Sequence, residues 1–204
     1  MGVISNGTTL LDAGALDSGI ATGAMTLIKT LTASSSANLS FVHGASDVVL
    51  DGTYKEYVFK FINIHPASDG THLQVGFRDG SSNYDATVTT SFFRAGHAEA
   101  DNEYYLGYRT DSDLAQSTSA QRLGIFIGND NDQCCSGSLH LYDPSNTTFL
   151  KHFVARTSNT YYVDYHQDEF IGGYCNVTAA IDAVQFSMSS GNIDSGTIKL
   201  YGIK

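Results

Sequence analysis

Hydrophobic and polar residues alternate along most of the chain after residue 25, which is the period-two pattern of a β-strand with one buried face. The clearest example is KEYVFKFINI (55–64), where Tyr57 and Phe61 point to one face and Val58 and Ile64 to the other. The inward positions of the clearest strands predict a core that contains Phe59, Phe61, Val75, Phe77, Phe186 and Leu200.

Short segments of this kind recur along the chain and are separated by turns rich in Gly, Ser, Asn and Asp. The predicted strands cover residues 25–32, 38–43, 55–64, 71–78, 86–94, 103–109, 121–127, 137–142, 148–156, 159–166, 177–188 and 195–203. Because no long helical stripe interrupts them, the pattern predicts an all-β fold. The spacing of the turns favours a single antiparallel β-sandwich of the jelly-roll kind.

The composition changes near residue 24, where a Gly-, Ala- and Ser-rich opening gives way to denser strands. We therefore expect an extended N-terminal arm (1–24) followed by one β-sandwich domain (25–204). A chain of 204 residues suits a single all-β domain. At this size a chain buries about 70% of its extended surface on folding, enough for a core without metal or disulfide support.

The arm contains several large apolar residues, although it is otherwise rich in Gly, Ala and Ser. We expect it to leave its own domain and add a strand to the sheet of a neighbouring subunit, with its glycines as a flexible joint. The alternative is that it folds back on its own domain. The residues predicted to form this subunit interface are Val3, Ile4, Leu10, Leu11 and Leu16.

The chain is acidic, with a net charge of −10, and only 16% of its residues are charged. A nucleic-acid backbone would be repelled, so nucleic acid is not an expected partner. Anionic lipid is disfavoured for the same reason, and no segment is long and apolar enough for a membrane helix. We see no standard secretory signal and expect the protein on an extracellular filament or a virion surface.

The sequence shows no enzyme signature. It lacks a GxSxG elbow and the Walker and Rossmann glycine patterns, and its seven histidines have no HExxH or HxH spacing. We therefore expect no enzymatic activity, no catalytic residues and no cofactor. A β-sandwich hydrolase stays open as an alternative because it needs only two suitably placed carboxyl groups. The neighbouring carboxylates are Asp101 with Glu103, Asp111 with Asp113, and Asp168 with Glu169.

The segment GNDNDQ (128–133) offers several oxygen ligands of the kind that Ca²⁺ prefers, and Asp130 and Asp132 are its calcium candidates. The segment lacks the full pattern of an EF-hand loop. An Asn/Asp turn that satisfies its own backbone explains it more simply, and we favour that interpretation. We expect no other metal site.

The three cysteines include an adjacent pair, Cys134 and Cys135, and disulfide geometry seldom allows neighbours to bridge each other. We expect three reduced thiols. A disulfide between one member of the pair and Cys175 remains open.

Two tyrosine pairs, Tyr104–Tyr105 and Tyr161–Tyr162, could form a platform for a sugar. Strand alternation favours a different arrangement, in which one member of each pair lies in the core and the other on the surface.

The closing stretch MSSGNIDSGTIKLYGIK (188–204) predicts two strands joined by a tight turn at Gly191 and Asn192, forming a hairpin in the core. Together with residues 57–85, it resembles uncharacterised β-sandwich virion and tail-fibre-like structural proteins of marine tailed phages and related filament-forming environmental proteins. The resemblance implies a structural or surface protein of a particle or filament, and it implies no catalytic residues.

These observations predict a non-enzymatic structural subunit of a phage particle or an extracellular filament. Its partner is expected to be itself, in a homo-oligomer or helical filament linked by exchange of the N-terminal arm. The alternative is a carbohydrate- or receptor-binding module of the tail-fibre kind, whose partner would be a cell-surface glycan.

Overall fold

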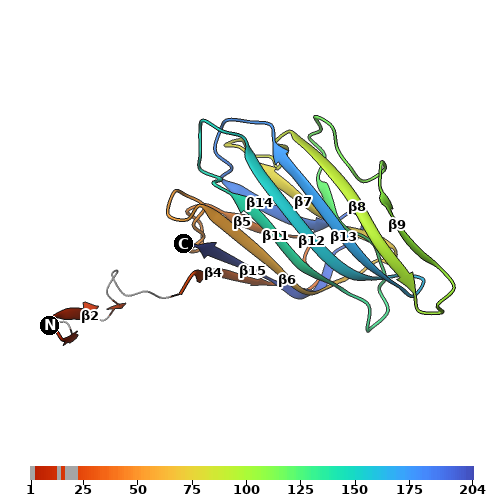
Figure 1. Ribbon diagram of the computed structural model, residues 1–204, viewed down its shortest axis with the longest axis horizontal. Helices are drawn as coiled ribbons and strands as arrows, with labels where there is room; N and C mark the ends of the chain where they lie inside the picture. The colour runs from red at the N-terminus through yellow and green to blue at the C-terminus, as the bar shows by residue number, and fades with distance from the viewer. Residues whose placement is uncertain (1–2, 13–14, 17–22) are drawn as a thin grey trace.

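The computed structural model describes residues 3–12, 15–16 and 23–204, and in these ranges every regular element is a β-strand (Figure 1). The strands are β1 (Val3–Ser5), β2 (Thr8–Asp12), β3 (Ala15–Leu16), β4 (Met25–Thr32), β5 (Asn38–Val42), β6 (Glu56–Pro66), β7 (Thr71–Arg78), β8 (Val88–Ala98), β9 (Tyr104–Tyr108), β10 (Gln121–Ile127), β11 (Cys135–Tyr142), β12 (Lys151–Tyr161), β13 (Tyr165–Cys175), β14 (Ala183–Met188) and β15 (Ile193–Ile203). The all-β prediction is confirmed.

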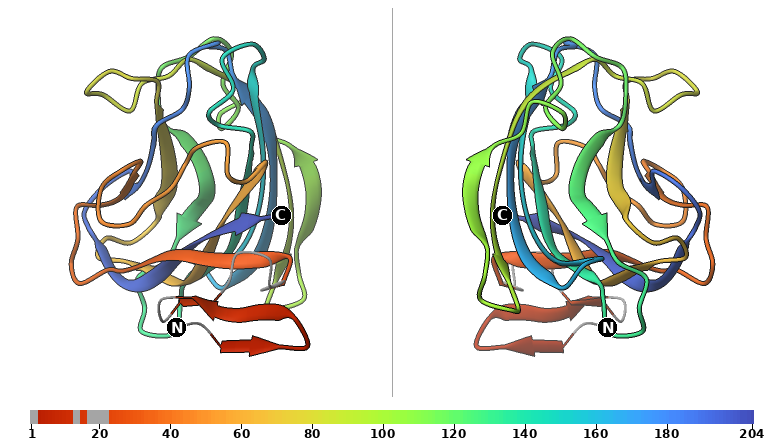
Figure 2. Two further views of the ribbon diagram at one scale, coloured as in Figure 1. Left: turned by 90° about the vertical axis from the view of Figure 1, so that its left-hand side faces the viewer. Right: turned by 90° about the vertical axis from the view of Figure 1, so that its right-hand side faces the viewer.

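Strands β4 to β15 belong to one antiparallel sheet of 12 strands. One flank runs β4-β15-β6-β11-β12-β13-β8-β9, and the other runs β10-β7-β14-β5. The two flanks meet where Ile127 at the end of β10 pairs with Tyr161 at the end of β12. The sheet curves so that the flanks face each other and nearly close on themselves (Figure 2). The predicted pair of separate sandwich sheets is not confirmed, because β10 hydrogen-bonds to both flanks.

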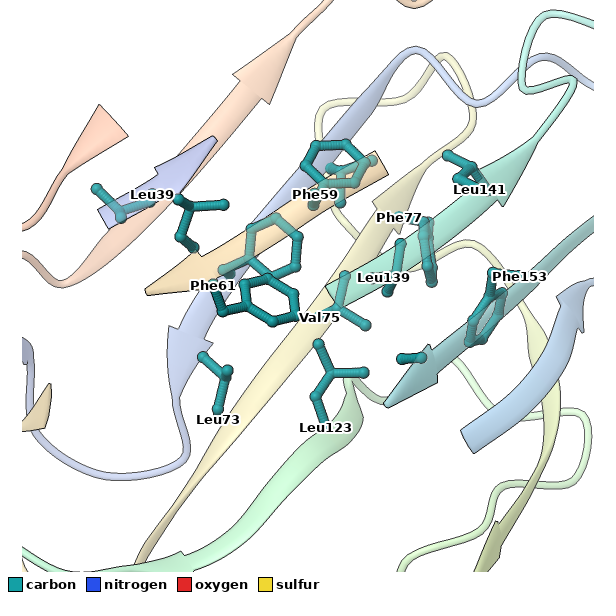
Figure 3. Packing of buried hydrophobic residues seen from close by; sticks show 14 of the residues in the cluster. Leu39, Phe59, Phe61, Leu73, Val75, Phe77, Leu123, Leu139, Leu141 and Phe153 are labelled. Carbon is teal, nitrogen blue, oxygen red and sulfur yellow. The ribbon is translucent and has the colours of Figure 1, made fainter. Parts of the chain in front are cut away.

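The core fills the space between the flanks (Figure 3). Phe186 on one flank packs against Phe59 and Phe61 on the other, with ring centroids 5.3 and 5.1 Å apart. Phe41 meets Phe59 edge to face at 5.2 Å, a favourable arrangement for aromatic rings. All six residues predicted to form the core are buried: Phe59, Phe61, Val75, Phe77, Phe186 and Leu200.

Ile64 departs from the predicted alternation of residues 55–64. It was expected on the face opposite Tyr57 and Phe61, but it is buried in the same core. Asn63 has a φ of 50°, and the pairing of β6 with both neighbours shifts register nearby. Such a bulge adds one residue to the strand and turns the next side chain to the other face.

The predicted break between strands 148–156 and 159–166 is wrong. β12 continues to Tyr161, and β13 pairs with it in unbroken register from Tyr165 to Cys175. The real turn falls at residues 162–164, where Asp164 has a φ of 61°. The aromatic and β-branched residues before it favour a strand, so a single Asp was the only turn signal in the sequence.

The predicted closing hairpin is also wrong. Gly191 does form a turn, with a φ of 71°, between β14 and β15. The two strands nevertheless separate, because β14 pairs with β5 and β7 whereas β15 pairs with β4 and β6. The turn therefore carries the chain from one flank of the sheet to the other.

The described part of the N-terminal arm forms a small antiparallel sheet, β1-β2-β3, instead of a single extended strand. Asn6 and Gly7 join β1 to β2, and both have positive φ, 49° and 80°. An Asn-Gly pair with two positive φ values is the preferred type I′ hairpin turn. Among the described residues, these strands pair only with one another.

Candidate functional site

The inner face of the sheet changes from apolar to polar along β12, β13, β8 and β9, which lie side by side (Figure 1). The pairing register places inward side chains in rows across these strands. From the core outward, and from β12 toward β9, the rows are Ala155–Ile171–Phe92, Thr157–Glu169–Arg94, Asn159–Gln167–Gly96–Tyr105 and Tyr161–Tyr165–Ala98. The first row belongs to the core, and the later rows bring buried polar groups together.

A hollow of about 270 Å³ lies at the polar end of these rows. We call it the tyrosine hollow. Its lining combines three aromatic rings with one positive and one negative side chain. The lining residues are Arg94, Glu103, Tyr105, Tyr161, Val163 and Tyr165.

Arg94 and Tyr105 form one wall of the tyrosine hollow. The Tyr105 ring lies over the Arg94 guanidinium group, whose carbon is 4.4 Å from the ring centroid, a cation–π distance. Tyr105 can lie flat because the residue opposite it on β8 is Gly96, where a Cβ atom would come within 2.3 Å of the ring. The backbone of β8 therefore fixes the position of this wall.

A hydrogen bond to a buried residue also holds the Arg94 side chain in place. Its Nη1 atom donates a hydrogen bond of 2.6 Å to Oε1 of Gln167, which is fully buried. Nε of Arg94 and Nε2 of Gln167 are buried without a hydrogen-bond partner among the described residues. Unsatisfied buried polar groups are rare in folded proteins and costly, so each needs a specific explanation.

Tyr161 and Tyr165 contribute two further aromatic rings to the lining. Their rings meet edge to face with centroids 5.7 Å apart, and the Tyr165 hydroxyl donates a 2.5 Å hydrogen bond to Glu103. That hydrogen bond raises the pKa of Tyr165, and burial raises the pKa of Tyr161 to about 12. Both hydroxyl groups therefore carry their protons at neutral pH and can donate hydrogen bonds.

Glu169 lies below the hollow and is fully buried. Burial raises its pKa to about 8, although hydrogen bonds from the Ile125 amide and Asn159 and the positive charge of Arg94 favour its charged form. The Ile125 amide is 3.2 Å from Oε1, and Nδ2 of Asn159 is 3.1 Å from it. The loss of hydration outweighs these contacts, so the site favours the neutral acid over the carboxylate.

The geometry around Thr157 agrees with a protonated Glu169. Oγ1 of Thr157 is 2.5 Å from the Leu123 carbonyl oxygen and 3.0 Å from Oε2 of Glu169. A hydroxyl group has one proton, and a carbonyl oxygen can only accept. If Thr157 donates its proton to the Leu123 carbonyl oxygen, its hydroxyl group can only accept from Glu169. The contact with Glu169 is then a hydrogen bond only if the Glu169 carboxyl group is protonated and donates.

Alternation holds for one of the two tyrosine pairs identified in the sequence: Tyr105 lines the hollow, whereas Tyr104 lies on the opposite face of β9 and is 86% exposed. It fails for the other pair, because β12 ends at Tyr161 and the Tyr162 ring in the following turn stacks on the Tyr161 ring, with centroids 4.7 Å apart and an interplanar angle of 25°. Of this stacked pair, Tyr161 lines the hollow. Sequence reasoning missed that one member of each pair meets the other in the same hollow, together with Arg94.

The neighbouring carboxylates do not act as pairs. Asp168 lies on the outer face with Arg156, at 2.9 and 2.6 Å, whereas Glu169 points into the core. Asp111 is held by Arg109, and Asp113 accepts a 2.7 Å hydrogen bond from Tyr108. Likewise, Asp101 contacts His97, and Glu103 accepts the bond from Tyr165. Each carboxylate has its own structural partner.

The calcium candidates Asp130 and Asp132 lie in an exposed loop. The Gln133 amide donates a 2.9 Å hydrogen bond to the Asp130 carbonyl oxygen, as expected for a self-satisfied turn. In residues 3–12, 15–16 and 23–204, no group of three His, Cys, Asp or Glu side chains is placed to hold a metal ion.

The structure argues against a disulfide between Cys175 and the Cys134–Cys135 pair. Cys135 on β11 pairs with Asn159, whereas Cys175 on β13 pairs with Lys151. These two positions on β12 are eight residues apart, about 26 Å along a strand. A disulfide needs Cα atoms within about 7 Å.

The outer face of the same strands carries a second candidate surface. The Arg156 guanidinium lies 4.9 Å from the Phe170 ring centroid, and Phe170 stacks on Phe93 at 4.9 Å with an interplanar angle of 4°. Phe93 pairs with Tyr108 of β9. Tyr104, Leu106 and Tyr108 continue this surface and are 86%, 76% and 53% exposed. We call these three residues the outer β9 surface.

No family model, curated protein or solved structure matches the chain. No helix in the described part of the chain is long and apolar enough to span a membrane. Function is therefore inferred from the chemistry of the tyrosine hollow and the outer β9 surface.

Proposed function

We propose that the protein is a non-enzymatic structural subunit that assembles with copies of itself, the N-terminal arm of one copy binding β9 of the next. The observation that carries this proposal is the state of β9. It pairs with β8 along one edge, and no described strand pairs with its other edge. Its outer side chains are large, apolar and exposed.

An unpaired strand edge is a template for pairing with another chain. Proteins that must stay monomeric usually protect such an edge with a charged residue or a proline. β9 has the sequence YYLGY and contains neither. The sheet has two other edge strands, β4 and β5. β4 contains Lys29, and β5 (NLSFV) contains no charged residue or proline, but its Leu39 and Phe41 are buried in the core. We therefore propose β9, with its large exposed side chains, as the edge that accepts a strand.

The N-terminal arm has the properties expected of the segment that binds the free edge of β9. Val3 and Ile4 on β1 are 52% and 65% exposed, and Leu11 on β2 is also exposed. A small sheet of two or three short strands is at best marginally stable without a packing surface. Burial against β9 would cover these side chains and pair the free backbone groups. The side chains of Leu10 and Leu16 lie outside what the structure describes.

Contacts between an arm and a different surface on the next copy are heterologous, so they close into a ring or continue as a filament. This geometry suits a subunit of a phage particle or an extracellular filament, which is where we place the protein. We also interpret the nearly closed sheet as a jelly-roll-like sandwich whose flanks stay joined at β10.

The edge contact is tested by Leu106→Lys, which places a charge on β9 without touching the core. The full chain is measured by size-exclusion chromatography with light scattering and by electron microscopy. We expect the wild type to form oligomers or filaments and Leu106→Lys to remain monomeric. Phe149→Lys is the matched control, since Phe149 is equally large and exposed but lies in a loop away from β9. A monomeric wild type, or equal assembly by both variants, would refute the proposal.

A further inference from the structure

We propose that the tyrosine hollow binds a neutral, hydroxyl-rich sugar ring. The ligand would stack on tyrosine faces and exchange hydrogen bonds with Arg94, Glu103 and the tyrosine hydroxyl groups. This inference goes beyond the assembly role and does not depend on it, because the hollow lies on the inner face of the sheet.

The charges of the lining favour a neutral ligand. Arg94 and Glu103 both line the hollow, one positive and one negative. A cationic ligand such as a quaternary ammonium group would suit the tyrosines, but it would be repelled by Arg94. An anionic ligand would be repelled by Glu103 and by the net charge of −10.

The aromatic rings favour a ligand with an apolar face as well as polar edges. Tyr105, Tyr161 and Tyr165 line the hollow from strands β9, β12 and β13. Binding sites of this kind combine aromatic surface with a few polar groups that fix the orientation of the ligand. A sugar ring presents C–H groups on its faces and hydroxyl groups around its edge, and it matches such a lining.

Hydrogen-bonding capacity remains available at the hollow. Glu103 uses one carboxylate oxygen to accept the bond from Tyr165, and its other oxygen has no hydrogen-bond partner among the described residues. Tyr105 and Tyr161 keep their hydroxyl protons, because burial raises both pKa values. The lining thus offers at least one strong acceptor and two donors.

Two contacts explain how the Arg94 side chain is fixed in position before a ligand binds. Gln167 accepts a hydrogen bond from Arg94, while Tyr105 covers its other side. The unpartnered nitrogen atoms of Arg94 and Gln167 make this arrangement costly, so stability alone does not account for it. A preorganised cationic group at a binding hollow does account for it, because preorganisation lowers the cost of binding.

The test measures binding of the methyl glycosides of glucose, galactose, mannose and N-acetylglucosamine by saturation-transfer NMR and isothermal titration calorimetry. We expect at least one of them to bind the wild type. Tyr105→Ala should abolish this binding. Tyr104→Ala is the matched control, because the neighbouring ring points to the opposite face, and it should bind like the wild type.

A second variant keeps the test decisive if Tyr105→Ala fails to fold. Glu103 is exposed, so Glu103→Ala should leave the domain folded and weaken sugar binding about tenfold, the effect of losing one hydrogen bond to a charged group. Choline and acetate serve as cationic and anionic probes. The proposal is overturned if none of the four glycosides binds, if only choline or acetate binds, or if Glu103→Ala and Tyr104→Ala bind equally well.

Discussion

Glu169 shows at the scale of one residue how the polar end of the core is built. It is an acid without exposed surface, surrounded by an amide nitrogen, a hydroxyl group and an Asn side chain. The sequence analysis paired it with Asp168 as a neighbouring carboxylate, but the two lie on opposite faces of β13, and Asp168 is on the outer face with Arg156. Its burial could not be predicted, because a Glu in a strand is most often exposed.

The raised pKa of Glu169 predicts how stability depends on pH. The folded protein favours the neutral acid, with a pKa of about 8 against 4.5 for an unperturbed Glu. Its stabilising contribution is therefore complete below about pH 4.5 and is lost as the pH rises through about 8. The shift corresponds to about 5 kcal/mol over the whole window.

Glu169→Gln isolates this contribution, because Gln is neutral at every pH and has nearly the same shape. We expect the variant and the wild type to have similar stability at pH 4.5, within about 1 kcal/mol. At pH 8 the variant should be more stable by several kcal/mol. Urea unfolding at both pH values measures the difference. Parallel pH profiles for the two proteins would contradict a neutral Glu169.

At the scale of elements, the hollow is a product of strand register. Periodicity identified most strands of the large sheet and assigned most faces correctly, including the six predicted core residues, but it missed residues 167–175 of β13 and the arm strands β1, β2 and β3. It could not show that β9, β8, β13 and β12 become neighbours, because pairing partners leave no local signal in one sequence. Arg94, Tyr105 and Tyr161 therefore looked unrelated until the register aligned them.

Turn chemistry explains the remaining differences between sequence and structure. The bulge at Asn63 and the turn at Asp164 both use a non-glycine residue with positive φ. Asn and Asp adopt this conformation more readily than other residues, but they also occur widely in ordinary loops. The Asn6–Gly7 turn was a clear hairpin signal that the prediction of an extended arm overlooked.

The pairing of β8 with β9 offers a local test of the hollow. In Gly96→Ala the new methyl group would collide with the Tyr105 ring, which must move off Arg94. We expect a loss of about 1–3 kcal/mol in unfolding free energy, typical of overpacking. In Gly107→Ala, on β9 itself, the new methyl group has no atom within 4 Å and should cost much less. Thermal unfolding of both variants checks this, and equal losses would contradict the described contact.

At the scale of the whole molecule, the domain and the arm differ in how they are stabilised. The buried core draws its residues from the large sheet and from the loops that connect its strands, starting at Ala33. The described residues of the arm contribute nothing to it, and Val3, Ile4 and Leu11 are exposed. The domain should therefore fold without the arm, whereas the arm needs a surface to cover it. In the proposed assembly, that surface is β9 of another copy.

The most direct measurement is the assembly state of a chain that lacks residues 2–18, determined by size-exclusion chromatography with light scattering and by electron microscopy. The full chain is the reference, and thermal unfolding of both proteins shows whether the domain remains intact. We predict that the truncated chain keeps the thermal transition of the full chain but is monomeric, while the full chain assembles. If the truncated chain forms the same oligomers or filaments as the full chain, the arm does not link the subunits and the proposed mode of assembly is wrong.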